Sequence, residues 1–377
     1  MLFQILMFSM LFLYLVLIGS FFIGFRKMPV FLEKEMVPRT GFSLVVVYRN
    51  EAENLPELLN SIVALDYPRE LFEVFLVNDH SEDASVGICE RYAKDFPEIR
   101  FQLLNAESSL SPKKDAIFLA AGKARFEYLA ITDADCLLPS QWLRNFDQLL
   151  QEESPVLIAG PVGFRHTMSA SFSEAFEEID FLSLQGSTIG GFGMNKPFMC
   201  NSANLCYRKS AYLHLQQQRR DLGIASGDDV FLLQHFLQHQ LPVSFVKSEK
   251  SIVRTGFQKS FQQLFWQRVR WAAKTSAYPD AFGKIVAIVV FFTNLMTVTW
   301  FFFAVFQFWN FQLVFGMILA KFLVDFPLIA VTAKFFGRKA VLTSYWWAAV
   351  IYPFFSTAVA LRSVFGGYYW KGRPFKR

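Results

Sequence analysis

Long uncharged apolar segments at both ends constrain the fold of this chain more than any other feature. Residues 2–24 (LFQILMFSMLFLYLVLIGSFFIG) contain no charged side chain. Three further apolar segments lie at residues 285–309, roughly 311–333 and roughly 341–361. A helix of about 20 apolar residues is long enough to cross a bilayer. We therefore expect transmembrane helices at both ends: an N-terminal anchor (residues 1–25) and three C-terminal segments (residues 285–362).

A cleaved signal peptide is the alternative for the first segment. No basic region precedes it, its apolar stretch is longer than usual, and no small-x-small cleavage site is clear before Arg26 and Lys27. We expect an uncleaved anchor.

Basic residues next to the apolar segments predict the topology. Arg26 and Lys27 follow the first segment, and Lys334, Arg338 and Lys339 lie between the last two. Cytoplasmic loops are enriched in Lys and Arg, so everything from about residue 26 to 284 should be cytosolic. Three C-terminal spans would, however, leave the basic tail (residues 363–377) outside. Pro353 offers an alternative, because it could break the last span into a re-entrant or shallow segment and return the tail to the cytosol.

One apolar segment contains a pair of opposite charges, Lys321 and Asp325. They are four residues apart and can pair on one helix face. Intramembrane charges usually face a protein interior or a cavity, so a substrate path is the alternative to simple pairing and packing.

The charge balance and the cysteines exclude some classes of protein. The net charge is +5, and much of it lies near predicted membrane edges, where contact with anionic lipid is a simpler interpretation than nucleic-acid binding. The four cysteines (Cys89, Cys136, Cys200 and Cys206) form no CxxC pair. We expect them to be reduced and mostly buried.

Between residues 40 and 250, short apolar runs alternate with helical patterns. The expected strands are residues 42–48, 73–78, 100–105, 127–132, 156–163 and 243–247, and the expected helices are residues 53–65, 84–95, 113–123, 140–151, 171–184, 208–218 and 228–239. The alternation predicts an α/β fold with a mostly parallel sheet flanked by helices. The first four strands are continuous apolar runs, as in strands covered by helices on both faces. Ligands bind such sheets beyond the carboxyl ends of the strands.

Acidic clusters follow two of these strands. One is Asn78-Asp79-His80-Ser81-Glu82-Asp83 and the other is Asp133-Ala134-Asp135. Either cluster alone could form a turn or a helix cap. Asp133 and Asp135, one residue apart at a strand end, could also hold one hard cation, Mg²⁺ or Mn²⁺, which would bridge a diphosphate.

Four sequence motifs follow one another between residues 45 and 135. They are Val45-Val46-Val47-Tyr48-Arg49-Asn50-Glu51, the stretch from Leu65-Asp66-Tyr67-Pro68 through Glu73 to Asp79-His80-Ser81-Glu82-Asp83, Lys113 with Ala116-Ile117, and Asp133-Ala134-Asp135. Together they resemble family 2 glycosyltransferases of the GT-A fold. The resemblance implies that Glu51, Asp79, Lys113 and Asp133 bind a nucleotide sugar, with Lys113 beside the phosphates, and that Asp133 and Asp135 hold the metal.

Two later motifs extend the resemblance. Gly227-Asp228-Asp229 opens an expected helix and resembles the acidic pair whose second member is the catalytic base, here Asp229. Alone, this pair would be a helix cap. Gln267-Arg268-Val269-Arg270-Trp271 fits the QxxRW signature, and Gln267, Arg270 and Trp271 share one helix face.

The resemblance implies that the QxxRW residues, with Asp228, contact the diphosphate and the acceptor. The same region (residues 251–284) is aromatic and basic, which is also typical of an amphipathic helix in the membrane interface.

The expected function is an inverting, metal-dependent transfer of a sugar from a nucleotide sugar, a UDP-sugar in the first instance, to a membrane lipid or lipid-linked acceptor. The domain at residues 26–250 would be cytosolic, at a plasma membrane of the bacterial inner type. A small processive polysaccharide synthase is the alternative, although residues 190–207 lack the Phe-x-Cys-Gly signature of cellulose-type synthases. A non-catalytic scaffold with a transferase-like fold is a third interpretation. Asn78 replaces an acid found in many members, which would place more of the nucleotide contact on Asp79.

Overall fold

The computed structural model describes residues 2–107, 111–166, 171–216, 228–274, 277–278, 280–306, 310–366, 368–370 and 373–375. The chain forms two compact units. The helical unit comprises Met1–Pro29, His166–Phe198 and Phe257–Arg377, and the sheet unit comprises Val30–Arg165 and Met199–Gly256. His166–Phe198 thus groups with the helical unit, although it lies inside the sequence range expected for the transferase domain.

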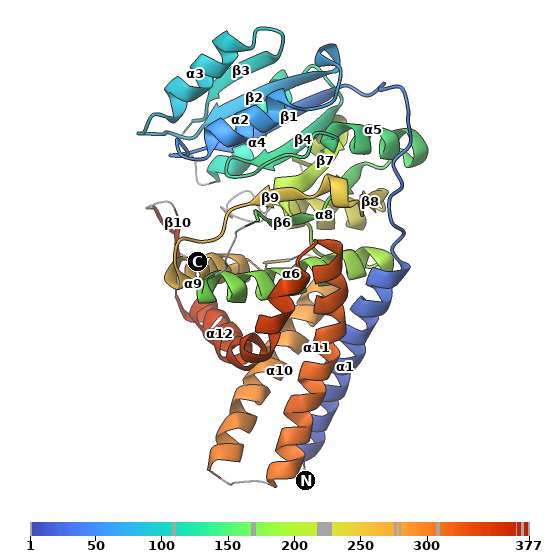
Figure 1. The fold of residues 1–377 in the computed structure, drawn as a ribbon, viewed down its shortest axis with the longest axis vertical. Helices are drawn as coiled ribbons and strands as arrows, with labels where there is room; N and C mark the ends of the chain where they lie inside the picture. The colour runs from blue at the N-terminus through green and yellow to red at the C-terminus, as the bar shows by residue number, and fades with distance from the viewer. Residues whose placement is uncertain are drawn as a thin grey trace. The chain divides into compact units, whose positions relative to one another are not determined.

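The sheet unit is built on a seven-stranded, mostly parallel sheet, as the sequence predicts (Figure 1). Its strand order is β3 (Arg100–Asn105), β2 (Phe72–Asn78), β1 (Phe42–Tyr48), β4 (Tyr128–Asp133), β7 (Leu205–Arg208), β5 (Leu157–Ala159) and β8 (Val243–Phe245). β1 pairs in parallel with β2 and β4, and β2 with β3. Only β7 runs antiparallel to its neighbours among these strands. The α/β fold class is confirmed.

Three details of the sheet differ from the prediction. The expected strand at residues 156–163 is two strands, β5 and β6 (Val162–Phe164), and β6 pairs with β9 (Val253–Thr255) in a separate small sheet. β7 and β9 were not predicted, because strands of three or four residues give too short a pattern. β3 is an edge strand in which no residue is buried, rather than a strand covered on both faces.

Helices flank the sheet close to their predicted positions. They are α2 (Leu55–Val63), α3 (Ser85–Asp95), α4 (Pro112–Lys123), α5 (Trp142–Glu153), α7 (Lys209–Gln216) and α8 (Asp228–Gln238), with short 3-10 turns η1 (Arg69–Leu71), η2 (Ser202–Asn204) and η3 (Glu249–Ser251). Residues 217 and 218 of one predicted helix, and Gly227, lie outside the described residues. All four cysteines are buried and none forms a disulfide, as expected.

A buried asparagine joins the strands on one side of this sheet. Asn204 is fully buried, and its side-chain oxygen accepts a hydrogen bond from Trp142 Nε1 at 2.8 Å. Its side-chain nitrogen donates to the carbonyl oxygens of Pro161 and Ser251, each at 2.8 Å. Gly160 leaves room for this amide, since a Cβ there would lie 2.3 Å from it. These bonds fix the segment that leads into β7 and thereby position η2 at the edge of the sheet.

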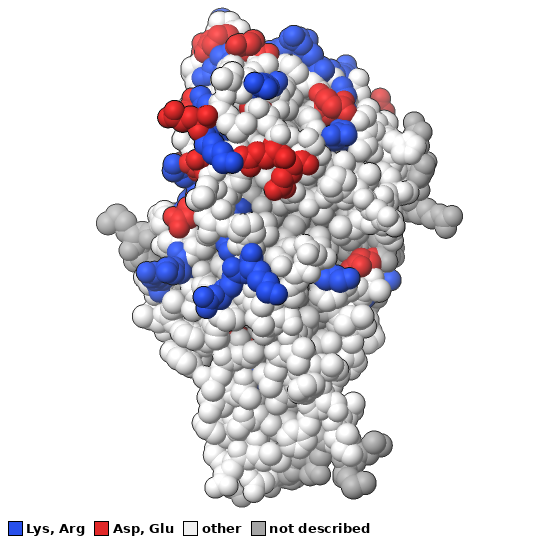
Figure 2. Space-filling view, turned by 90° about the vertical axis from the view of Figure 1, so that its right-hand side faces the viewer, with Lys and Arg blue, Asp and Glu red and all other residues white. Residues whose placement is uncertain are grey.

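The helical unit contains the apolar ends of the chain. Its elements are α1 (Leu2–Lys27), α6 (Phe172–Gly193), α9 (Phe261–Ala273), α10 (Ala281–Val305), α11 (Phe311–Phe335), η5 (Lys339–Ser344), α12 (Tyr345–Phe365) and a hairpin of β10 (Tyr368–Trp370) and β11 (Arg373–Phe375). Within the part of the chain that the structure describes, four helical segments, one at each expected position, are long and apolar enough to cross a membrane: Ile5–Lys27, Ala281–Val305, Phe311–Phe335 and Lys339–Phe365. On the face that Figure 2 shows, the described residues of the lower part of this unit display no Lys, Arg, Asp or Glu side chains.

Glycines let two of these helices touch through their backbones. A Cβ on Gly190 of α6 would lie 2.4 Å from the carbonyl oxygen of Phe21 in α1. A Cβ on Gly193 would lie 1.9 Å from the carbonyl oxygen of Gly24. Small residues permit such close approach between helices in a bilayer. The helix predicted to end at residue 184 therefore continues to Gly193, because this glycine-rich stretch packs against α1.

The two opposite charges in α11 form the predicted pair. Lys321 Nζ lies 2.9 Å from Asp325 Oδ2, and Asp325 Oδ1 accepts a hydrogen bond from the Tyr14 hydroxyl at 2.7 Å. Lys321 is buried, with its ammonium 5.2 Å from the centre of the Tyr14 ring. This set holds α1 against α11, so pairing and packing account for both charges.

Candidate active site

The carboxyl ends of three central strands meet at one edge of the sheet. Tyr48 at the end of β1 is in register with Asn78 at the end of β2, and Val47 of β1 is in register with Asp133 of β4. The strand order changes direction here, because β2 and β3 lie on one side of β1 and β4 lies on the other. Such a switch point is where ligands bind in open parallel sheets.

Lys113 at the start of α4 is the central cation of this edge. Its Nζ lies 2.5 Å from Asp133 Oδ1, 2.8 Å from Ser202 Oγ and 3.7 Å from Asp228 Oδ2. Burial by itself lowers the pKa of Lys113, but the charges of Asp133, Asp228 and Asp229 together outweigh it and raise that pKa well above its ordinary value. The ammonium therefore stays charged among the carboxylates.

Asp229 lies on the same side of the sheet as Asp133. Its Oδ2 accepts a hydrogen bond from the backbone nitrogen of Ser202 at 3.1 Å, and the Ser202 hydroxyl lies 3.5 Å from Asp133. Its Oδ1 accepts from the nitrogen of Val230 at 2.8 Å, at the N-terminus of α8. The positive end of the helix dipole stabilises a carboxylate at this position. The structure thus brings together Lys113, Asp133, Asp228 and Asp229, which the sequence placed far apart.

Asp135 lies two positions after Asp133, next to this cluster. Its Oδ2 accepts a hydrogen bond from the Thr255 hydroxyl at 3.3 Å, and Cys136 Sγ is 3.5 Å from Oδ1. Among the described residues, no group of three or more His, Cys, Asp and Glu side chains could hold a metal ion by itself. Mg²⁺ is usually held by one or two carboxylates together with phosphate oxygens and water. The donor set of Asp133 and Asp135 fits a cation of that kind, completed by a diphosphate.

The turns after β1 and β2 are joined by hydrogen bonds. The backbone nitrogen of Glu51 donates to Ser85 Oγ at 2.9 Å, and the Glu51 carboxylate accepts from Asn54 Nδ2 at 2.6 Å. Asn50 and His80 both have positive φ, of 52° and 56°. The turn backbone is therefore held in a left-handed conformation that Asn and His adopt more readily than most residues.

Asp79 is almost completely buried in the second of these turns, with 3% of its surface exposed. Its backbone nitrogen donates to the carbonyl of Tyr48 at 2.8 Å, and its carbonyl accepts from Arg49 at 3.3 Å. The side-chain oxygen of Asn78 accepts a hydrogen bond from the backbone nitrogen of Ser81 at 2.9 Å. Asn78 therefore shapes the turn that presents Asp79.

The QxxRW residues lie in the helical unit, on α9. Gln267 and Trp271 both contact Arg268. The guanidinium of Arg268 donates a hydrogen bond to the side-chain oxygen of Gln267. The guanidinium carbon of Arg268 lies 4.3 Å from the centre of the Trp271 ring. Arg268 is buried and donates to Asp180 of α6 at 2.6 Å. Contact of Gln267, Arg270 and Trp271 with the substrates stays a prediction.

Several residues of structural importance were not singled out from the sequence. Ser202 lies within the Asn-Ser-Ala-Asn-Leu-Cys-Tyr-Arg motif, yet only the fold reveals that it bridges Asp133 and Asp229. Arg268 and Asp180 pair across 88 positions of the chain. The signal available for Asp180 was the unusual presence of acidic residues within an apolar helix, since such residues are rarely buried without partners.

Comparisons with known proteins agree with this geometry. Residues 43–213 match the family described as Glycosyl transferase family 2. The chain is 23% identical over 146 residues to glycosyltransferase AglE of Haloferax volcanii, covering 38% of this chain and 47% of that protein. It is 27% identical over 122 residues to a beta-monoglucosyldiacylglycerol synthase of Trichormus variabilis, covering 32% of this chain and 26% of that protein. The matched part spans less than half the length of either relative.

A solved structure resembles the chain over almost its full length. It is the mannosyltransferase PcManGT of Pyrobaculum calidifontis, in complex with GDP-Man and Mn²⁺. The TM-score is 0.60 at 16% identity, with 96% of both chains covered. The likeness concerns the fold. Residues 43–213 therefore match the Glycosyl transferase family 2 model, and the fold is GT-A-like.

Proposed function

We propose that this protein transfers a sugar, with inversion, from a nucleotide sugar to a hydroxyl of a membrane lipid or lipid-linked acceptor. The observation that carries the proposal is the cluster of Lys113, Asp133, Asp228 and Asp229 around Ser202 at the switch point of the sheet. The cluster combines a cation, two carboxylates that lie beside it and a further carboxylate in the first turn of a helix. Those are the groups needed to bind a diphosphate and to accept a proton.

The donor would bind along the sheet edge. Asp79 and Glu51, in the turns after β2 and β1, would contact the nucleoside, and we propose a UDP-sugar. Lys113 would contact the phosphates. Asp133 and Asp135 would hold Mg²⁺ or Mn²⁺, which when bound stabilises the negative charge that grows on a departing nucleotide diphosphate. The mannosyltransferase PcManGT has a similar fold and was solved with Mn²⁺ and a nucleotide sugar, which supports the proposal of a divalent metal ion.

Asp229 would act as the general base. Its two oxygens each accept one backbone hydrogen bond, from Ser202 and from Val230, which orients the carboxylate. A carboxylate oxygen has a second lone pair, so Oδ1 or Oδ2 can still take the proton of an acceptor hydroxyl. Removing that proton makes the oxygen a better nucleophile at the anomeric carbon, and attack opposite the leaving diphosphate inverts the configuration.

A lipid acceptor is supported by the membrane-spanning character of the helical unit. Its four apolar helices would hold the chain in a bilayer, which brings lipid hydroxyls close to the protein. The beta-monoglucosyldiacylglycerol synthase relative points to the same acceptor class. On α9, Gln267, Arg270 and Trp271 would contact diphosphate and acceptor, together with Asp228 of α8. We propose an integral plasma-membrane protein of the bacterial inner type with its sheet unit in the cytosol.

Product analysis tests the proposal. Detergent-solubilised full-length protein is incubated with Mn²⁺ or Mg²⁺, a panel of UDP- and GDP-sugars and a membrane lipid extract, and the products are weighed by mass spectrometry. We expect a lipid whose mass increases by one hexose-type residue with a UDP-sugar. A ladder of long glycans would overturn the lipid acceptor, and full activity in excess chelator would overturn the metal role of Asp133 and Asp135.

A further inference from the structure

The small second sheet, formed by β6 and β9, contacts the loop that follows β4. Its two strands are parallel, with Phe164 in register with Thr255, and so both strands end at the same edge (Figure 1). At that edge the backbone nitrogen of Arg165 donates a hydrogen bond to the carbonyl oxygen of Thr255 at 2.9 Å. Arg165 and Thr255 are therefore neighbours, and both contact Asp135 in the loop after β4.

β9 holds the backbone of this loop. The nitrogen of Leu137 donates to the carbonyl oxygen of Arg254 at 2.7 Å, and the nitrogen of Arg254 donates to the carbonyl oxygen of Leu137 at 3.0 Å. The two residues form an isolated antiparallel bridge, two positions after Asp135. The Arg254 guanidinium also donates to the carbonyl oxygen of Phe164 at 2.9 Å, which ties β9 to β6. The loop is thus hydrogen-bonded to a paired strand and does not stand alone.

Arg165, directly after β6, holds the same loop on the other side of the bridge. Its guanidinium donates to the backbone carbonyl oxygen of Asp135 at 2.9 Å, and it forms an ion pair with Glu57 of α2. Hydrogen bonds from a charged guanidinium are stronger than those between neutral groups. The backbone at Asp135 and at Leu137 is therefore fixed by residues of both strands of the small sheet.

The side chain of Asp135 is also contacted from β9. The hydroxyl of Thr255 donates a hydrogen bond to Asp135 Oδ2 at 3.3 Å, across 120 positions of the chain, and this contact is partly buried. A threonine side chain is branched at Cβ and has few rotamers. The direction of the hydroxyl is therefore set by the position of β9, and β9 in turn is fixed to the loop by the bridge between Arg254 and Leu137.

A hydrogen bond of this kind matters most for a carboxylate that binds a metal ion. A side chain loses rotational freedom when it binds a cation, and a donor that already holds it reduces the entropy lost on binding. The carboxylate keeps further lone pairs for the cation, because each oxygen has two. Hydrogen-bond partners of metal ligands typically change metal affinity by about 10- to 100-fold.

We propose that Thr255 is a positioning residue that orients the Asp135 carboxylate for Mg²⁺ or Mn²⁺. Arg165 and the bridge at Leu137 would fix the backbone of Asp135, and Thr255 would fix its side chain. Asp133, in contrast, contacts the ammonium of Lys113, whose charge opposes that of a metal ion. The neutral hydroxyl of Thr255 orients Asp135 without such repulsion. This role rests on the proposed metal-binding function of Asp135 and is independent of the acceptor.

Manganese binding to the detergent-solubilised full-length protein tests the proposal. Free Mn²⁺ is measured by electron paramagnetic resonance in the presence of saturating UDP. Thr255→Val keeps the branched shape but has no donor, whereas Thr255→Ser keeps the hydroxyl. We expect Thr255→Val to bind Mn²⁺ about tenfold more weakly and Thr255→Ser to recover most of that loss. UDP affinity in excess chelator, measured by calorimetry, should be the same in both variants and in the native protein.

Ser244→Ala is the matched control. The hydroxyl of Ser244 in β8 donates to Glu153 at 2.7 Å, so this variant removes a hydroxyl–carboxylate bond at the far edge of the seven-stranded sheet. We expect it to bind Mn²⁺ like the native protein. Equal losses in Thr255→Val, Thr255→Ser and Ser244→Ala would trace the effect to general destabilisation and overturn the positioning role.

Asp135→Asn separates this role from the proposed function. If Asp135→Asn binds Mn²⁺ about tenfold more weakly or worse while Thr255→Val binds it like the native protein, Asp135 is a metal ligand that Thr255 does not orient. The positioning role then falls and the proposed function stands. If Asp135→Asn itself binds Mn²⁺ like the native protein, the metal role of Asp135 falls, and the role of Thr255 falls with it.

Discussion

At the residue scale, the site combines groups whose effects can be separated experimentally. Lys113 and Asp229 are both linked to Ser202, but they would serve different steps. Lys113 shares a carboxylate with any cation that binds at Asp133, whereas Asp229 has its own two backbone donors. Substitutions at the two positions should therefore change different measurable quantities.

Asp229→Asn should stop transfer and leave the donor in place. Asn is as good a helix cap as Asp, and its single side-chain oxygen can still accept from one of the two backbone nitrogens, that of Ser202 or that of Val230. It cannot take a proton, so we expect kcat to fall by about 10²- to 10⁴-fold. Nucleotide affinity, measured by calorimetry, should change less than twofold. Unchanged turnover would assign the base to another group.

Lys113→Met should move metal and donor affinity in opposite directions. The ammonium lies 2.5 Å from Asp133 and 3.7 Å from Asp228, so its removal leaves a more negative cluster. We expect Mn²⁺ to bind the donor-free protein about tenfold more tightly, which corresponds to about 1.4 kcal/mol, and UDP to bind more weakly. Manganese binding is followed by electron paramagnetic resonance, and Lys113→Arg, which keeps the charge, is the control. Weaker manganese binding in Lys113→Met would refute this role.

At the element scale, α6 determines the stability of the helical unit. It presents buried acidic residues to α9 and η5 and glycines to α1. Asp180 pairs with Arg268, Glu178 forms an ion pair with Arg338, and the Glu177 carboxylate accepts from the backbone nitrogen of Gln258 at 2.9 Å. Asp180 and Glu178 are each paired with an arginine, whereas the Glu177 carboxylate accepts a hydrogen bond from a backbone amide.

Glu177 should make stability depend on pH. Burial raises its pKa to about 7, opposed by the hydrogen bond from Gln258 and the charge of Arg268. A carboxyl whose pKa rises on folding stabilises the folded state fully below its unfolded pKa, near 4.5, and this contribution disappears as pH rises to 7. The loss is up to about 3 kcal/mol.

The test is a melting curve in detergent between pH 4.5 and 8. We expect Glu177→Gln to melt higher than the native protein at pH 8 and to lose part of its pH dependence, because the amide keeps an acceptor for Gln258 and carries no charge. A native protein and a variant with parallel pH profiles would show that Glu177 titrates at its ordinary pKa.

The contact between α1 and α6 should tolerate no side chain. Gly190→Leu would place a Cβ 2.4 Å from the Phe21 carbonyl, so the helices must separate, at a cost of about 1–3 kcal/mol or more. Gly19→Leu on the partner helix α1 is the control, since no atom lies within 4 Å of its Cβ position. Thermal unfolding in detergent should show a lower midpoint only for Gly190→Leu. Equal midpoints would mean that the helices separate without cost.

At the scale of the whole molecule, the sequence indicated the layers of the fold better than its boundaries. The strands β1, β2 and β4 and the acidic residues after them were predictable, because buried parallel strands are apolar and their ends converge. The assignment of α6 was not, because a helix with four acidic residues gives no hint that it packs against an apolar anchor. Likewise, no local pattern could pair Ser202 with Asp229 or Arg268 with Asp180, since these contacts depend on tertiary folding.

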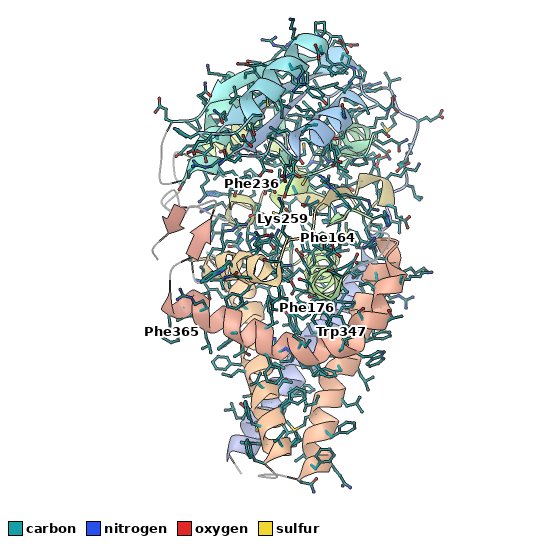
Figure 3. The ribbon with its side chains drawn as sticks, turned by 60° about the vertical axis from the view of Figure 1, so that its left-hand side comes forward. Phe164, Phe176, Phe236, Lys259, Trp347 and Phe365 are labelled. Atoms are coloured by element: carbon teal, nitrogen blue, oxygen red, sulfur yellow. The ribbon has the colours of Figure 1, made fainter. Side chains whose placement is uncertain are left out.

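The direction of α12, which crosses α10 and α11 instead of running alongside them (Figures 1 and 3), shows the same limit. Its length and composition are those of a spanning helix, and the sequence therefore gave two incompatible topologies for the tail. The direction of a helix relative to its neighbours depends on which face is packed, and here Phe355 and Tyr345 are buried while Phe354 and Trp346 are exposed. Both faces of α12 are apolar in the sequence, so the sequence does not indicate which face packs against a neighbouring helix.

The position of α6 in the chain also decides how the catalytic part can be produced by itself. A fragment cut at the two apparent borders of the sheet unit (residues 30–256) would still carry His166–Phe198, now without α1 and α11. Its glycine-lined and aromatic faces would meet water, and we expect such a fragment to aggregate on size-exclusion chromatography. A version in which a short polar linker replaces residues 166–198 should elute as a monomer and bind nucleotide. If the fragment that keeps residues 166–198 elutes as the monomer and the shortened version aggregates, α6 does not require α1 and α11 to stay soluble.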